Sequence, residues 1–141
     1  MEPRGQLFTT NPKGISKFDL DAEYLLITRA GYDIPNTTRV SALSPSPKLF
    51  HRYITSWRGH SPYDWWPEYE KLFLEELKSE EKLTALRYVY KQLLMSKNII
   101  LICYCNDHRF CHRRLVAEFF VTYGVSHCEL SPQTNEQISF L

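Results

Sequence analysis

One apolar run in the second half of the chain constrains the fold more than any other feature. Residues 99–105 read IILICYC, a continuous hydrophobic stretch. A strand that is buried on both faces has this composition, because none of its side chains faces water. We therefore predict that residues 99–105 form a central strand of a parallel sheet.

A helix is predicted directly after this strand. Beyond a polar loop at 106–110, apolar residues recur at the spacing of one helical face: Leu115, Val116, Phe119, Phe120 and Tyr123. Gly124 follows, where a left-handed residue commonly ends a helix. In open α/β sheets, ligands bind beyond the carboxyl ends of the strands, where helix N-termini present free N–H groups. We therefore expect a functional site in the loop between this strand and this helix.

The rest of the chain supplies further strands and helices. Extended segments are predicted at 6–9, 23–29, 38–43 and 125–130, and helices at 48–57, 67–77 and 80–96. Residues 58–62 are expected to be a loop. The tryptophans in the following segment, 63–67, are expected to pack a loop onto the core, or alternatively to stack on a base. This order of elements favours an α/β layered fold with right-handed crossovers. We predict a single three-layer Rossmann-like domain over residues 1–141, with a mostly parallel sheet, flanking helices and a polar tail at 131–141.

The charge and the N-terminus narrow the class of protein. With 17 Lys and Arg against 16 Asp and Glu, the formal net charge is +1, which does not suit a protein that coats duplex DNA or an acidic membrane. Residues 1–14 lack the apolar core of a signal peptide, and no run reaches the roughly 18 apolar residues needed to cross a bilayer. We expect a cytoplasmic protein without a membrane partner. Its cysteines are then expected as free thiols, metal ligands or redox groups before disulfides.

The loop after the predicted central strand holds the densest group of reactive and cationic side chains: Cys105, Asp107, His108, Arg109, Cys111, His112, Arg113 and Arg114. Free N–H groups at the start of the next helix, the helix dipole and Arg113 together suit a phosphate or a carboxylate. The same field lowers the pKa of a thiol and favours its use as a nucleophile. If the strand at 23–29 is parallel to the central strand, Arg29 emerges at the same edge as a second anion ligand.

Two other interpretations of the cysteine loop stay open. Its sulfur and imidazole groups are ligand types that zinc prefers, although paired cysteines separated by two residues are missing: Cys103, Cys105, His108, Cys111 and His112. The cysteines are alternatively small core hydrophobes, because free cysteine is among the most buried residue types.

This loop resembles the family called domain of unknown function 488. The family's hallmark is an apolar strand ending in Leu-Cys, an acidic position two residues later, and Cys-His-Arg at the start of a helix. The corresponding residues here are 101–103, Cys105 and 111–113, and weaker similarity extends over most of 23–130. The resemblance implies a compact α/β domain with a parallel sheet and a site at the sheet edge. Cys105 stands where the family usually has a glutamate, so a general base at that position would be lost or replaced by a thiol.

Our leading hypothesis is a small α/β protein that binds an anionic ligand, a nucleotide or a nucleic-acid end, at this loop. Cys111 and His112 are the candidate catalytic residues, as a thiolate and a proton donor. The expected ligand-binding residues are Arg29, Cys103, Cys105 and Arg113. The sequence assigns no metal or cofactor, and it leaves enzymatic activity and the oligomeric state open. The alternative is a non-enzymatic protein-interaction module, with an exposed surface of Tyr63, Trp65 and Trp66 and a structural, zinc-bound cysteine loop.

Overall fold

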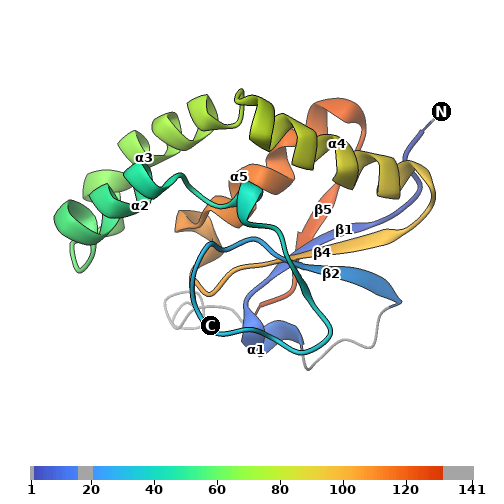
Figure 1. Ribbon diagram of the computed structural model, residues 1–141, viewed down its shortest axis with the longest axis horizontal. Helices are drawn as coiled ribbons and strands as arrows, with labels where there is room; N and C mark the ends of the chain where they lie inside the picture. Colours follow the sequence, from blue (N-terminus) through green and yellow to red (C-terminus); the bar gives the residue numbers. More distant parts are fainter. Residues whose placement is uncertain (1, 16–20, 132–141) are drawn as a thin grey trace, which may run out of the picture.

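β4 (Asn98–Ile102) is the central strand of a parallel sheet in the computed structural model, which describes residues 2–15 and 21–131 (Figure 1). The strand order is β3-β2-β4-β1-β5, and every pairing between neighbours is parallel. The other strands are β1 (Leu7–Thr10), β2 (Ala22–Leu26), β3 (Thr38–Arg39) and β5 (His127–Glu129). The α/β Rossmann-like fold predicted from the sequence is therefore confirmed.

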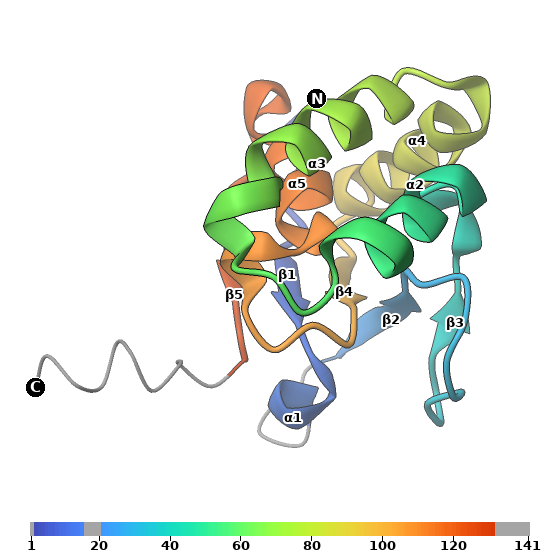
Figure 2. The ribbon, with the colours of Figure 1, turned by 90° about the vertical axis from the view of Figure 1, so that its left-hand side faces the viewer.

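The helices lie mainly on one face of this sheet. They are α2 (Pro47–Arg52), which continues as a π-helical turn over Tyr53–Trp57, α3 (Pro62–Glu76), α4 (Glu80–Leu94) and α5 (His112–Phe119). The short helix α1 (Pro12–Ile15) lies on the opposite side, as Figures 1 and 2 show. The layers on the two faces of the sheet are thus unequal in thickness.

Each face of the sheet has its own core, because successive side chains of a strand point to opposite faces. Ile99 and Leu101 of β4 face the helices α2 to α5 and belong to the larger core. Ile100 and Ile102 belong to a smaller cluster with Leu26, which α1 and the connection between β2 and β3 partly cover. All four residues 99–102 are buried, two on each face of the sheet, which explains the unbroken apolar run in the sequence.

The structure corrects the predicted bounds of two elements at the sheet edge. β4 ends at Ile102, so residues 103–105 lie beyond the strand and not in it. The predicted strand at 38–43 is reduced to Thr38–Arg39, followed by a 3-10 turn over Ser41–Leu43. Both strands end where their parallel neighbours end, because a strand without a hydrogen-bonded partner leaves its backbone groups unsatisfied.

The prediction that a helix begins at Pro67, after a loop that carries the tryptophans, is wrong. Helix α3 begins at Pro62, and Pro67 lies inside it. A proline inside a helix removes one backbone hydrogen bond, so Pro67 is better suited to a helix start than to this position. The aromatic side chains of the first turns compensate, because Trp65, Trp66 and Tyr69 are buried in the larger core.

The other predicted elements are confirmed in type. Ser79 caps α4 by accepting a hydrogen bond from the Lys82 N–H (3.3 Å). α5 is followed by a 3-10 turn that ends at Gly124, whose φ is 84°. Of the predicted polar tail, residues 132–141 lie outside the described residues. No helix in the ranges 2–15 and 21–131 is long and apolar enough to cross a membrane.

Candidate functional site

A cavity of about 380 Å³ lies at the carboxyl edge of β2 and β4. Its aromatic walls come from α2, its π-helical extension, α3 and the loop after β4: Phe50, Tyr53, Trp65, Tyr69, Tyr104 and Phe110. Five side chains predicted from the sequence also line it: Arg29, Cys103, Cys105, Cys111 and His112. The cavity therefore joins a mostly apolar chamber to a small set of reactive side chains, which is the usual composition of a small-molecule site.

Two cysteines and a histidine converge at the base of this cavity. Cys103 follows β4, and Cys111 and His112 stand at the start of α5. His112 Nδ1 lies 3.8 Å from Cys103 Sγ and 4.0 Å from Cys111 Sγ, and all three residues are buried. Cys105 is exposed, and its Sγ lies 3.8 Å from Cys103 Sγ. We call Cys103, Cys111 and His112 the Cys-His cluster.

The orientation of the His112 ring is set by the backbone of the neighbouring strand. Nε2 lies 2.7 Å from the carbonyl oxygen of Ile27, just after β2. A carbonyl oxygen only accepts, so Nε2 carries a proton and donates it. This bond directs Nδ1 toward the two sulfur atoms. The ring also packs against Phe73, with ring centroids 5.6 Å apart.

The contacts within the Cys-His cluster shift the pKa values of its members in opposite directions. Hydrogen bonds from Cys105 and Cys111, together with the charge of His112, lower the pKa of Cys103 well below that of an ordinary thiol, although burial opposes this. Burial by itself lowers the pKa of His112, but the charges and hydrogen bonds of Cys103 and Cys111 together outweigh it and raise that pKa well above its ordinary value. The hydrogen bonds with Cys103 and Cys111 and burial raise the pKa of Cys105.

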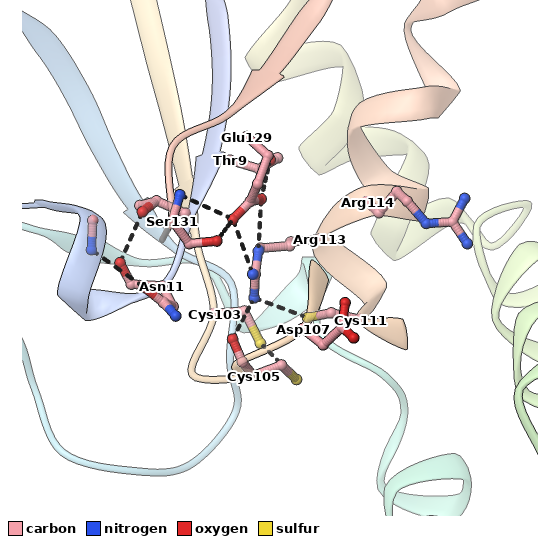
Figure 3. Close-up of polar contacts among 12 residues, drawn as sticks. Thr9, Asn11, Cys103, Cys105, Asp107, Cys111, Arg113, Arg114, Glu129 and Ser131 are labelled. Atoms are coloured by element: carbon pink, nitrogen blue, oxygen red, sulfur yellow. Dashed lines mark hydrogen bonds and ion pairs between the residues drawn. The ribbon is translucent and has the colours of Figure 1, made fainter. Parts of the chain in front are cut away.

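Arg113 connects the cluster to the edge strand β5 (Figure 3). Its Nε and Nη2 each lie 3.0 Å from a carboxylate oxygen of Glu129. Nη1 donates to the carbonyl oxygen of Cys105 (2.9 Å) and approaches Cys111 Sγ (3.4 Å). The Arg113 side chain is fully buried and does not line the cavity. Its guanidinium therefore holds the cysteine loop in place.

Glu129 is a further residue of this arrangement that the sequence did not indicate as functional. Thr9 Oγ1 donates to Glu129 Oε1 (2.6 Å), and Ser131 donates to Oε2 through its backbone N–H (3.2 Å) and through its hydroxyl. Burial by itself raises the pKa of this carboxyl group, but the hydrogen bonds from Arg113, Ser131 and Thr9 together lower it below its ordinary value.

This lowered pKa predicts a loss of stability in acid. A carboxyl group whose pKa is lower in the folded state stabilises the fold above its unfolded pKa of about 4.3, and this contribution disappears as the pH falls through the folded pKa. We expect the free energy of unfolding, measured by urea titration, to fall below about pH 4.3. In Glu129→Gln this part of the decline should be missing, although the variant is less stable at neutral pH. An equal acid slope in both proteins would contradict the assignment.

Residues 28–32, most of which line the cavity, form a rim that we call the lip, and Arg39 holds this segment in place. The sequence did not indicate this role of Arg39. Its Nη1 donates to the Thr28 carbonyl (3.2 Å) and hydroxyl (2.7 Å) and to the Ala30 carbonyl (3.2 Å). Its Nη2 donates to the carbonyls of Gly31 and Tyr32, both at 3.2 Å. The Arg39 side chain thus donates hydrogen bonds to four backbone carbonyl groups of the segment that carries Arg29.

Gly31 allows this lip to close against the loop after β4. Its φ is 105°, in the region that favours glycine, and a Cβ atom there would lie 2.5 Å from the Tyr104 ring. The Tyr104 hydroxyl donates to the Tyr32 carbonyl, and the two tyrosine rings lie 4.7 Å apart. The lip and the cysteine loop therefore contact each other directly.

The predicted site residues divide into two groups in the structure. The cavity brings five of them together: Arg29, Cys103, Cys105, Cys111 and His112. Arg113 lies behind them, paired with Glu129. The signal in the sequence that could have indicated Glu129 is a charged residue within the predicted strand 125–130. Its partner Arg113 lies on another element, so no local pattern links the two residues.

The tryptophans that the interaction-module alternative places on the surface are buried. Trp65 is 6% exposed and Trp66 is 8% exposed, whereas Tyr63 is exposed. Trp65 lines the cavity, and Trp66 packs between Tyr69 and the guanidinium of Arg114. These two indoles therefore do not form an exposed docking surface.

The model of the family described as DUF488-N3a, Active DUF488-N3 subclade, matches residues 8–124. The chain belongs to this DUF488 family. The match includes β1, the cavity lip, the cysteine loop and α5, and it ends at Gly124, before Glu129. No curated protein and no solved structure is significantly similar to the chain.

Proposed function

We propose that this DUF488 protein binds a small anionic ligand with a planar ring, such as a nucleotide or the end of a nucleic acid, in the cavity beyond β4. The observation that supports this most strongly is the combination, in one cavity, of aromatic walls with a cation at the lip and the Cys-His cluster at the base. Aromatic side chains stack on nucleic-acid bases, and an arginine binds phosphate through paired hydrogen bonds.

Arg29 is the cation available for the ligand's charge. It is exposed at the lip, and its Nη2 makes a long contact of 3.5 Å with the Ser41 carbonyl. Arg113 in contrast is fully buried and paired with Glu129. In this proposal Arg29 contacts the anion, and Arg113 acts through the position of the cysteine loop.

The Cys-His cluster is the place where the ligand is acted on. Cys111 and His112 are the proposed catalytic residues, and Cys103 and Cys105 shape the base of the cavity beside them. A cavity of about 380 Å³ lies within the size range of small-ligand sites, about 300–1,000 Å³.

Ligand binding is tested by titrating the protein with a nucleoside monophosphate, the matching nucleoside and inorganic phosphate in a calorimeter. We expect the monophosphate to bind most tightly, because only it uses both the aromatic walls and Arg29. Arg29→Gln should weaken its binding by about tenfold or more, the value of one charge-assisted hydrogen bond.

Arg87→Gln is the matched control. Arg87 is an exposed arginine on α4 that pairs loosely with Glu80 (3.8 Å) and lies outside the cavity lining. Its loss should leave the affinity unchanged. Equal affinity for nucleoside and monophosphate, or an equal effect of the two substitutions, would show that Arg29 does not bind the anion.

A further inference from the structure

We propose that the Cys-His cluster is a zinc site with its fourth coordination position directed to the cavity. One ligand atom from each of Cys103, Cys111 and His112 lies within 4.8 Å of the other two, and all three residues are buried. Tetrahedral zinc with ordinary bond lengths separates such ligand atoms by about 3.5–3.8 Å. The two nitrogen-sulfur distances, 3.8 Å and 4.0 Å, already approach this separation.

The contacts around the cluster are those of a metal site. A histidine that binds zinc usually donates its other ring N–H to a backbone carbonyl or a carboxylate, which fixes the ring. His112 does so through Nε2 and the Ile27 carbonyl, and its Nδ1 is left facing the sulfur atoms. Arg113 Nη1 approaches Cys111 Sγ at 3.4 Å, a contact that stabilises a thiolate.

The donor set indicates which metal is expected. Thiolate sulfur and imidazole nitrogen are ligands for zinc, whereas magnesium and calcium prefer oxygen. One hydrogen bond explains one sulfur atom at Nδ1, but a second sulfur atom at the same nitrogen finds no further donor or acceptor there. Convergence of three buried donors therefore favours a metal over simple packing.

The fourth position faces the cavity because all three ligands line it. Two cysteines, one histidine and an open position form the ligand set of a catalytic zinc site. Cys105 borders this position but is exposed, and we do not count it among the ligands. With zinc bound, Cys111 and His112 would serve the reaction as ligands of the ion and not as a free thiolate and proton donor, and the zinc would supply Lewis-acid polarisation of a ligand in the cavity. Metal binding itself requires no such ligand, so it is tested separately from the proposed function.

The experiment uses the full chain, stripped with a chelator under reducing conditions and titrated with Co²⁺ as an optical probe for zinc. We expect one equivalent to bind, with a near-ultraviolet band whose intensity corresponds to two thiolates and visible bands of tetrahedral cobalt. Zn²⁺ should displace the cobalt. If the stripped protein is folded and binds no Co²⁺, the proposal is overturned.

Substitutions then assign the ligands. Removing a residue that contacts a metal ligand, but not the metal, commonly lowers the metal affinity by about 10–100-fold. Removing a direct ligand should cost more, so we expect Cys103→Ser and Cys111→Ser each to lower the Co²⁺ affinity by more than about 100-fold. Cys128→Ser is the matched control, because Cys128 is an exposed thiol on β5. Cys105→Ser and Arg29→Gln should retain the spectrum of two thiolates. A loss in Cys105→Ser equal to that in Cys103→Ser would show a closed four-ligand site and overturn the open position.

A second measurement on the wild-type protein covers variants that fail to fold. Alkylation by iodoacetamide, followed by peptide mass spectrometry, reports each cysteine separately. Zinc should slow the alkylation of Cys103 and Cys111 relative to the stripped protein and leave Cys128 unchanged. Identical alkylation rates of Cys103 and Cys111 with and without zinc would overturn the assignment.

Discussion

Replacing Arg113 by methionine is expected to lower the free energy of unfolding by about 3–5 kcal/mol, the usual cost of removing one partner of a buried ion pair. The Arg113 side chain is fully buried and that of Glu129 is 13% exposed, so the substitution leaves a carboxylate without its cation. It also removes the donor to the Cys105 carbonyl. Urea unfolding of the variant and the wild-type protein at neutral pH measures the loss.

A surface ion pair provides the control for this prediction. Arg52 and Glu68 form a bond of similar length, 2.8 Å, but their side chains are 46% and 52% exposed. Arg52→Met should therefore cost no more than about 1 kcal/mol. The double variant of Arg113→Met with Glu129→Leu should lose less than the sum of its single variants, because no charge is left unpaired. Additive losses would show that the two side chains do not interact.

Replacing Phe73 by alanine is the second large effect that we expect, a loss of about 3–5 kcal/mol. Phe73 of α3 is completely buried in the larger core, parallel to Tyr69 at 6.3 Å between ring centroids and in contact with the His112 ring. A truncated side chain leaves a cavity that its rigid aromatic neighbours fill poorly. Chemical unfolding again measures the loss.

The adjacent residue gives a matched control for Phe73. Leu74 stands next to it on the same helix, but 43% of its surface is exposed. Leu74→Ala should change the free energy of unfolding by less than about 1 kcal/mol, because little packing is lost. Phe73→Leu should recover most of the loss of Phe73→Ala, since it keeps an apolar side chain of comparable size. Similar losses at positions 73 and 74 would contradict the burial of Phe73.

Local sequence patterns were sufficient to predict elements that follow one another directly in the chain. The unbroken apolar run predicted the central strand, because a strand covered on both faces has no side chain in water. The helix after it and the reactive loop between them followed from spacing and from Gly124. The parallel arrangement then placed Arg29 at the same edge as the cysteines, and the cavity lining agrees with this.

The predicted start of α3 failed because a proline has two local meanings. Pro67 was interpreted as a helix start, but the helix begins at Pro62 and continues through Pro67. Local propensity opposes this arrangement, and the burial of Trp65 and Trp66 stabilises it. The same packing brings the first turn of α3 to the cavity wall, so the helix start also decided part of the site.

By itself the sequence determined the type of fold, and it predicted the sheet edge at which the cavity lies and the reactive side chains that line it, since these depend on the order of strand, loop and helix. Only the tertiary structure decided what each cation does. Arg113 and Arg29 are equivalent in sequence, but Glu129 of β5 neutralises Arg113, whereas Arg29 faces the cavity. Arg39 likewise became a support of the lip because the backbone curls around it. These roles depend on which residues the folded chain brings next to each arginine, and the local sequence around each arginine does not indicate those partners.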